Sequence, residues 1–128
     1  LARDIVFLNE ISKNNNLESP LLKAVNKSNK IHKLWVLNTL DKELNGIEGK
    51  NISVLGLTYK PDTNTLRRSS SVELCNALVK KHCIVKCNDP SLDELPKNLK
   101  HKFKFVKSIE DTIKYSDAIV IATVWNQY

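Results

Sequence analysis

The chain has 128 residues, of which 41% are hydrophobic and 27% are charged, as in an ordinary soluble globular domain. No stretch of the sequence approaches the roughly 20 apolar residues that span a bilayer, so we expect no membrane-spanning helix in it. The net charge of +6 favours an anionic partner.

Residues 1–46 follow a helical pattern. Apolar residues at helical spacing predict a first amphipathic helix that ends in the polar run 13–16. Ser19 and Pro20 predict the start of a second helix, with Ser as its N-cap and Pro at its first position. No glycine or proline follows before Gly46, so the pattern predicts one long helix. Its apolar stripe predicts contact with another subunit or with a domain outside the chain.

Residues 47–128 alternate between strand and helix patterns. Strands are predicted at 51–56, 83–88, 103–106 and 117–123, and helices at 70–81 and from 108 onward. Ser70 and Glu73 form a capping-box pattern at the first of these helices. Near-continuous apolar strands that alternate with helices predict a parallel sheet covered on both faces. The predicted fold class is therefore α/β, with a helical segment over 1–46 and a Rossmann-like domain over 47–128.

Three cysteines, Cys75, Cys83 and Cys87, lie in the predicted domain. The odd number and the lack of a secretion signal favour reduced thiols and a cytoplasmic protein. Cys83 and Cys87 share one face of a strand, and their spacing does not match a CxxC zinc or redox pair. We expect buried structural thiols and no metal site.

The densest basic run covers residues 97–104, and Phe103 and Phe105 alternate with its last lysines. This pattern favours an exposed loop that leads into a short strand, with phenylalanines inward and lysines outward. A nucleic-acid surface is disfavoured, because no RNA- or DNA-binding motif accompanies the charge.

Residues 56–70, which follow the first strand, read GLTYKPDTNTLRRSS. This connection is longer than the usual two to six residues, and long loops in compact domains are usually functional. It combines an aromatic ring, three cations and several hydroxyls just before a helix amino terminus, where anions bind. Ligands of open parallel sheets bind at this carboxyl edge. Because the GxGxxG fingerprint is absent, we do not expect a dinucleotide bound in the usual way.

The segment 56–70 closely resembles the signature of the carboxyl-terminal domain of the UDP-glucose/GDP-mannose dehydrogenase family. Residues 88–90, 116–120 and 123–125 resemble three further family motifs in the expected order. Residues 1–4 are similar to the end of the family's active-site motif, Cys-Phe-Pro-Lys-Asp. The resemblance thus spans nearly the whole chain.

The resemblance implies roles for five residues. Tyr59 and Lys60 match the pair that contacts the sugar nucleotide, with the lysine near its phosphates. Arg67 matches an arginine that reaches NAD, Arg3 stands near the cofactor phosphates, and Asp4 matches a catalytic carboxylate. The alternatives are solvated loop charges for Lys60 and Arg67, and a ring that caps the sheet edge for Tyr59. Asp4 has the alternative of an ordinary acid in the first turn of a helix.

Four positions depart from the family's usual residues. Thr65, Arg68, His82 and Asn88 stand where Asp, Glu, Gly and Tyr are usual. These departures do not affect the predicted fold, but they leave the identity of the sugar and of the nucleotide base open.

In the intact protein, the resemblance implies an NAD-dependent oxidation of the sugar C6 hydroxyl to a carboxylate, with a cysteine as nucleophile. That cysteine would precede Leu1, and the NAD domain would also lie outside the chain. We therefore expect a fragment of a homodimeric, cytoplasmic enzyme of polysaccharide biosynthesis that binds a nucleotide sugar and is inactive alone. The alternative is a non-catalytic nucleotide-binding or oligomerisation module.

Overall fold

The computed structural model describes residues 2–128, which form two compact units divided after Val36. The first unit is helical, and the second, Leu37–Tyr128, is an α/β domain. None of the helices among the described residues is long and apolar enough to cross a membrane.

The helical unit contains α1 (Ala2–Asn14) and α2 (Pro20–His32). The predicted end of α1 is confirmed, and Asn16 adopts the left-handed conformation (φ 52°) that closes a helix while Leu17 N–H donates to Ser12 O. Asn9 joins the two helices, because its side-chain amide donates to Leu22 O at 3.1 Å.

Ser19 occupies the N-cap of α2, and Pro20 occupies its first turn, as predicted. The Ser19 hydroxyl does not cap the helix, however. It donates instead to the side-chain oxygen of Asn9, 3.3 Å away. The cap residue therefore helps to tie the helical hairpin together.

The prediction of one long second helix is wrong. The chain turns at residues 33–34 and continues as α3 (Trp35–Glu43). Leu37, Leu40 and Leu44 pack against the α/β core, whereas α2 has no buried residue. Packing on the core thus sets the course of α3, and no glycine or proline in the sequence signals the break.

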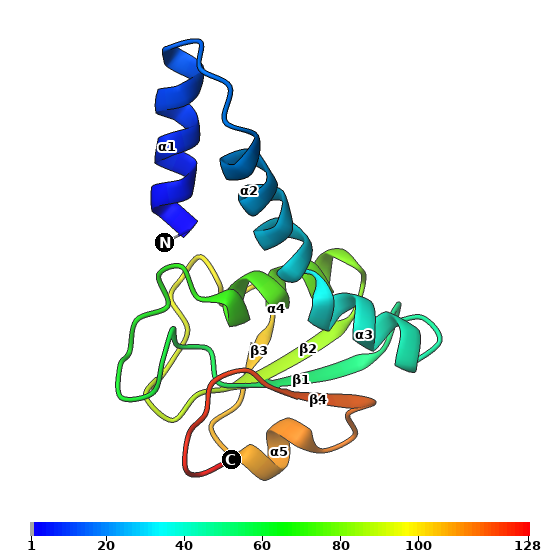
Figure 1. The fold of residues 1–128 in the computed structure, drawn as a ribbon. Coiled ribbons are helices and arrows are strands. Elements are labelled where there is room, and N and C mark those ends of the chain that lie inside the picture. Colours follow the sequence, from blue (N-terminus) through cyan, green and yellow to red (C-terminus); the bar gives the residue numbers. More distant parts are fainter. Residues whose placement is uncertain (1) are drawn as a thin grey trace. The chain divides into compact units, whose positions relative to one another are not determined.

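The α/β unit is built on a four-stranded parallel sheet in the order β3-β2-β1-β4 (Figure 1). The strands are β1 (Asn51–Leu55), β2 (Ile84–Asn88), β3 (Lys104–Phe105) and β4 (Ala118–Ile121). The helices that connect them are α4 (Ser70–Lys80) and α5 (Ile109–Ile113), which lie on opposite faces of the sheet (Figure 1). The predicted α/β fold with a parallel sheet is confirmed.

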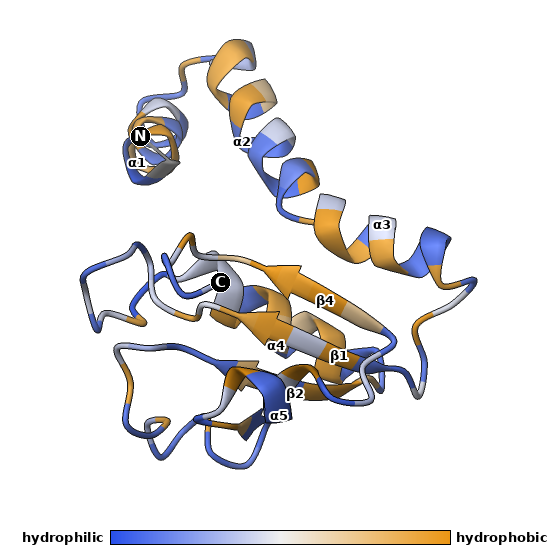
Figure 2. Ribbon diagram, turned by 90° about the horizontal axis from the view of Figure 1, so that it is seen from below, coloured by the Kyte–Doolittle hydropathy of each residue, from blue (hydrophilic) through white to orange (hydrophobic). Residues whose placement is uncertain are grey.

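The core lies between the sheet and α4, where hydrophobic stretches of strand and helix face each other (Figure 2). Ile52, Val54 and Leu78 are at most 1% exposed. The edge strand β4 differs from the prediction of a strand covered on both faces, since Ile119 and Ile121 are about half exposed (49% and 57%). The described residues therefore cover that face of β4 only in part.

The three cysteines are free and buried, as predicted. Burial raises the pKa of each thiol, and it raises that of Cys87 to about 12, with the Asp89 charge as a smaller cause. Thiols in this environment are poor nucleophiles. The described residues contain no group of three His, Cys, Asp or Glu side chains that could hold a metal ion.

The predicted short strand around residue 104 is also confirmed. Phe103 is 5% exposed and Phe105 is half-buried, while Lys104 between them is exposed. The lysines of the basic run 97–104 are therefore exposed, while Leu99 and Phe103 lie in the core and Phe105 packs against it.

His82 ends α4 in the left-handed conformation, with φ 60°. Its side chain is exposed, and glycine adopts this conformation without the cost of about 1 kcal/mol or more that a Cβ carries. We expect His82→Gly to raise the free energy of unfolding, measured in urea, by about 0.5–1 kcal/mol. This figure is the relief of backbone strain minus the larger conformational entropy that glycine loses on folding. His101→Gly, at an exposed position without positive φ, should give no gain. An equal gain in both variants would contradict the backbone argument.

Candidate functional site

The predicted binding loop leaves the carboxyl end of β1 at the point where the chain reverses its course across the sheet. From β1 the chain builds β2 and β3 on one side and then returns to place β4 on the other side of β1. Ligands of open α/β sheets bind in the crevice outside such a switch point. The topology thus places the loop where a ligand is expected.

The base of the loop is fixed by buried hydrogen bonds. Leu57 and Thr58 are at most 1% exposed, and their amides donate to one oxygen of Asp89, Oδ2, at 2.7 and 2.8 Å. The Thr58 carbonyl accepts the Thr123 hydroxyl at 2.8 Å, and the Leu57 carbonyl accepts the Ser69 hydroxyl at 2.5 Å. Three segments that are distant in sequence therefore hold these two residues.

Ser69 also begins α4, since its hydroxyl oxygen accepts the amides of Ser71 and Val72 at 3.1 and 3.2 Å. The prediction of Ser70 as N-cap is therefore wrong by one residue. The reason is the tie to Leu57, which fixes the Ser69 side chain inside the domain, whereas Ser70 is exposed. One side chain thus closes the loop and caps the helix that follows it.

Gly56 lies at the start of the loop with φ 91°, a conformation that disfavours other residues. Its Cα faces the end of β4 so closely that a Cβ would lie 2.5 Å from the Thr123 Cβ. This contact brings the segments that follow β1 and β4 together at the switch point, and it requires glycine.

The tip of the loop projects into solvent. Tyr59 is 67% exposed, and Lys60 and Arg67 are exposed as well. The tip is closed by the Tyr59 amide, which donates to Thr65 O at 3.0 Å. None of the ion pairs found among the described residues involves Lys60 or Arg67. The loop therefore combines a fixed base with cationic and aromatic side chains that are free to meet a ligand.

Arg3 and Asp4, the other two predicted site residues, lie in the first turn of α1 and are exposed. They belong to the helical unit, while Tyr59, Lys60 and Arg67 belong to the α/β unit. The roles of all five residues stay predictions. An open cavity of about 710 Å³ in the helical unit, lined by four lysines, contains none of them.

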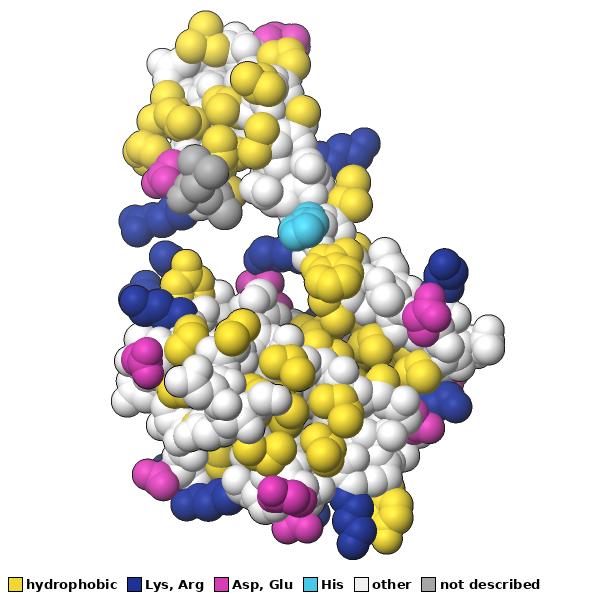
Figure 3. Space-filling view, turned by 60° about the horizontal axis from the view of Figure 1, so that its bottom comes forward, with side chains coloured by type: hydrophobic (Ala, Val, Ile, Leu, Met, Phe, Trp, Pro, Cys, Tyr) yellow, Lys and Arg dark blue, Asp and Glu magenta, His cyan; other side chains and the backbone are white. Residues whose placement is uncertain are grey.

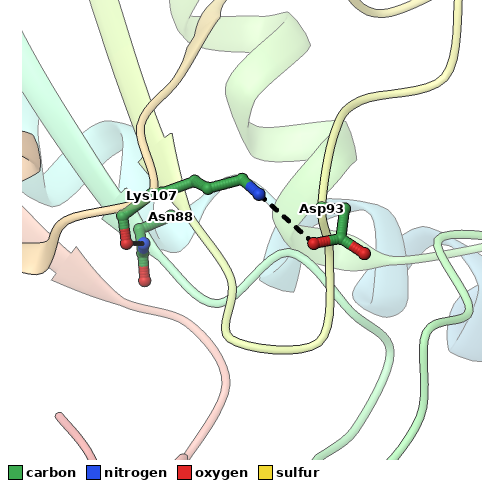
Figure 4. A network of polar contacts seen from close by, with 3 residues as sticks. All are labelled: Asn88, Asp93 and Lys107. Atoms are coloured by element: carbon green, nitrogen blue, oxygen red, sulfur yellow. Dashed lines mark hydrogen bonds and ion pairs between the residues drawn. The ribbon is translucent and has the colours of Figure 1, made fainter.

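A second network of polar contacts, centred on the buried Asn88, supports the carboxyl ends of β2 and β3. The Asn88 side-chain amide donates to the carbonyls of Val106 and Lys107 at 2.8 and 2.9 Å, and its oxygen accepts the Tyr128 hydroxyl at 2.8 Å. Lys107 in turn reaches Asp93 with its amine at 3.2 Å, as Figure 4 shows. Asn88, which departs from the family's usual Tyr, is thus a structural tie between neighbouring strand ends.

Asp89, Ser69 and Thr123, which hold the base of the loop, are not among the site residues predicted from the sequence. The signal that was available is the Asp-Pro pair directly after β2, because a polar residue there lies at the same sheet edge as the loop after β1. No local pattern reveals which amides such a carboxylate accepts.

The comparisons with known proteins agree with this arrangement. Residues 53–128 match the family model described as the UDP-glucose/GDP-mannose dehydrogenase family, UDP binding domain. The chain is 40% identical to a UDP-glucose 6-dehydrogenase of Rickettsia felis, over 98% of this chain and 29% of that protein. It is 30% identical to one of Bacillus subtilis, over 96% of this chain and 28% of that protein.

Among solved structures, a UDP-glucose dehydrogenase from the archaeon Pyrobaculum islandicum has a TM-score of 0.88 at 26% identity, over 99% of this chain and 30% of that one. A GDP-mannose dehydrogenase with a TM-score of 0.79 and 21% identity shows the same fold. The chain spans about 30% of the length of these relatives. With more than half of its residues matched by the family model, the chain belongs to the UDP-glucose/GDP-mannose dehydrogenase family and carries its UDP-binding domain.

Proposed function

We propose that the protein containing this chain is an NAD-dependent nucleotide-sugar 6-dehydrogenase, which oxidises the C6 hydroxyl of a sugar such as that of UDP-glucose to a carboxylate. The observation that carries the proposal is the loop after β1, whose exposed side chains include Lys60 and Arg67, at the switch point of a UDP-binding domain. The names of the relatives from Rickettsia felis and Pyrobaculum islandicum support UDP-glucose as the substrate class. The chain itself supplies nucleotide-sugar binding and is inactive alone.

Lys60 contacts the phosphates of the nucleotide sugar, and Tyr59 contacts its flat or sugar portion. The Lys60 ammonium makes no ion pair with the other described residues, so it has none of these to break when it binds a phosphate. A charge-assisted bond of this kind contributes about 1.5–3 kcal/mol. The fixed base of the loop supports these roles, because it lowers the entropy lost when the two side chains engage a ligand.

NAD is bound mainly by a domain outside this chain, and it supplies a hydride acceptor when bound. Arg67 reaches it from the binding loop, and Arg3 lies near its phosphates. The exposed guanidinium of Arg67 suits an anionic group, since it presents a planar fork of donors. Asp4 is the catalytic carboxylate of this chain and orients groups beside the cysteine nucleophile, which is proposed to precede Leu1.

The helical segment over residues 1–46 is proposed to form a homodimer interface. Residues 47–128 are proposed to form the nucleotide-binding domain. Hydrophobic side chains gather over the helical hairpin (Figure 3), and Phe7, Leu21 and Ile31 are 60–75% exposed. Exposed apolar patches of this kind mark interaction sites. The three free buried thiols are consistent with the reducing cytoplasm, where this enzyme would work in polysaccharide biosynthesis.

The test is NADH formation by the full-length protein with UDP-glucose, GDP-mannose and UDP-N-acetyl sugars. We expect two NADH per sugar oxidised. Lys60→Ala should raise KM about 10- to 100-fold, because it removes one charge-assisted phosphate contact. Lys97→Ala, in the exposed basic loop, is the matched control and should leave KM unchanged.

A folded full-length protein that contains the upstream cysteine but oxidises none of these sugars would exclude the dehydrogenase proposal. Binding of UDP without turnover would then favour the non-catalytic nucleotide-binding module. An equal rise in KM for Lys60→Ala and Lys97→Ala would show a general effect of charge, not a contact made by Lys60.

A further inference from the structure

Asp89 is a buried carboxylate, 2% exposed, and it accepts five hydrogen bonds from neutral donors. Its Oδ2 accepts the amides of Leu57 and Thr58 and the Thr58 hydroxyl, at 2.7, 2.8 and 2.9 Å. Its Oδ1 accepts the Ser91 amide and hydroxyl at 3.0 and 2.7 Å. None of the ion pairs among the described residues includes it. A buried charge without a cation is costly, so its donors must compensate for the lost water.

The environment of Asp89 keeps it ionised. Burial raises the pKa of its carboxyl, but the hydrogen bonds from Ser91, Thr58 and Leu57 together outweigh burial and lower the pKa below its ordinary value. A carboxylate is acceptor-only, so both of its oxygens serve the donors around them. An asparagine of the same shape would turn an NH₂ group toward one of the two sets of donors.

The bonds to Oδ2 fix the residues that immediately precede Tyr59 and Lys60. Two consecutive amides on one oxygen set the orientation of two successive peptide planes, and Thr123 holds the Thr58 carbonyl from the other side. Tyr59 and Lys60, which follow Thr58, are exposed. A small rotation at this point would therefore be magnified at the end of the Lys60 side chain.

We propose that Asp89 is a positioning residue for the nucleotide-sugar loop: it sets the direction in which Tyr59 and Lys60 leave the sheet and thereby the affinity for the phosphates. The inference rests on the proposed function of Lys60. Asp89 acts through Leu57 and Thr58 and does not touch the ligand itself.

The test is a double-mutant cycle in the full-length protein, with the Kd for UDP measured by titration calorimetry. Asp89→Asn should weaken UDP binding about 5- to 10-fold, because charge-assisted bonds become neutral ones and the loop loses its fixed base. In the Lys60→Ala background the same change should weaken binding less than about 2-fold, because the ammonium that Asp89 positions is already absent.

Asp117→Asn is the matched control. Asp117 also accepts a backbone amide, that of Asn51 at 2.7 Å, but at the amino end of β1, whereas Asp89 holds the residues after its carboxyl end. Asp117→Asn should leave the Kd unchanged. If Asp89→Asn fails to fold, Thr58→Val removes only the hydroxyl bond at 2.9 Å. It should weaken binding about 2- to 3-fold, again only when Lys60 is present.

Effects of Asp89→Asn and Lys60→Ala that simply add would overturn the positioning role while leaving the proposed function intact. If Lys60→Ala alone does not weaken UDP binding, the proposed contact of Lys60 is wrong, and the positioning role that depends on it falls too. Equal losses in Asp89→Asn and Asp117→Asn would identify a general loss of stability and would also overturn the proposal.

Discussion

Replacing Gly56 by alanine should lower the free energy of unfolding of the α/β unit by about 4 kcal/mol or more, a large part of the total stability of an ordinary domain. A Cβ at this position would lie 2.5 Å from the Thr123 Cβ and 2.6 Å from the Thr123 nitrogen, far inside contact distance. The obstacle is backbone, and Ala122 and Thr123 are held by hydrogen bonds to Leu55 O. The end of β4 cannot move aside without breaking the sheet.

The matched control is Gly49→Ala, measured in the same urea unfolding experiment followed by circular dichroism. Gly49 also has a positive φ, 74°, but a Cβ there would meet nothing within 4 Å. It should cost only the backbone strain of about 1–2 kcal/mol. The difference between the two variants measures the close approach of β1 and β4, and similar losses in both would show that this approach is not tight.

The helices and strands of the α/β unit could be predicted because local sequence patterns specify them. The buried strand β1 is an apolar run bounded by Asn51 and Gly56, and the helices around it carry recognisable caps and periodic apolar positions. Hydrophobic burial depends mainly on which residues are apolar and at what spacing, so a parallel sheet with connecting helices could be inferred. The exposed face of β4 could not, because apolarity alone does not tell whether a partner covers it.

The details that failed depend on contacts between distant residues. The break before Trp35 arises because α3 packs on the core through Leu37 and Leu40, which no local signal shows. The N-cap shifts from Ser70 to Ser69 because Ser69 bonds the Leu57 carbonyl twelve residues earlier. Local propensity is weak enough that tertiary contacts of this kind decide the outcome.

The candidate site divides in the same way. Tyr59, Lys60 and Arg67 could be proposed because they form part of one contiguous motif, and the structure places all three in one exposed loop. Asp89 lies some thirty residues away, and its importance comes from three-dimensional hydrogen bonds. Candidate ligand-binding groups can thus be proposed from the sequence, whereas the groups that hold them in place require the fold.

Ser69→Ala should lower the free energy of unfolding by about 1.5–5 kcal/mol, which combines two losses. The first is the helix cap, since the Ser69 hydroxyl oxygen accepts the Ser71 and Val72 amides, and this is worth about 0.5–2 kcal/mol. The second is the buried Leu57 carbonyl, which would lose its hydroxyl donor at a cost of about 1–3 kcal/mol. Urea unfolding of the full-length protein measures the sum.

Ser108→Ala separates these two losses, because Ser108 caps α5 through the Asp111 amide at 3.1 Å but bonds no buried carbonyl with its hydroxyl. It should cost only about 1 kcal/mol. Because Ser69 joins the end of the binding loop to its beginning, Ser69→Ala should also weaken UDP binding, whereas Ser108→Ala should not. Equal losses of stability in the two variants would mean that the tie between Ser69 and Leu57 contributes nothing, and the loop would then be held by Asp89 and Thr123 alone.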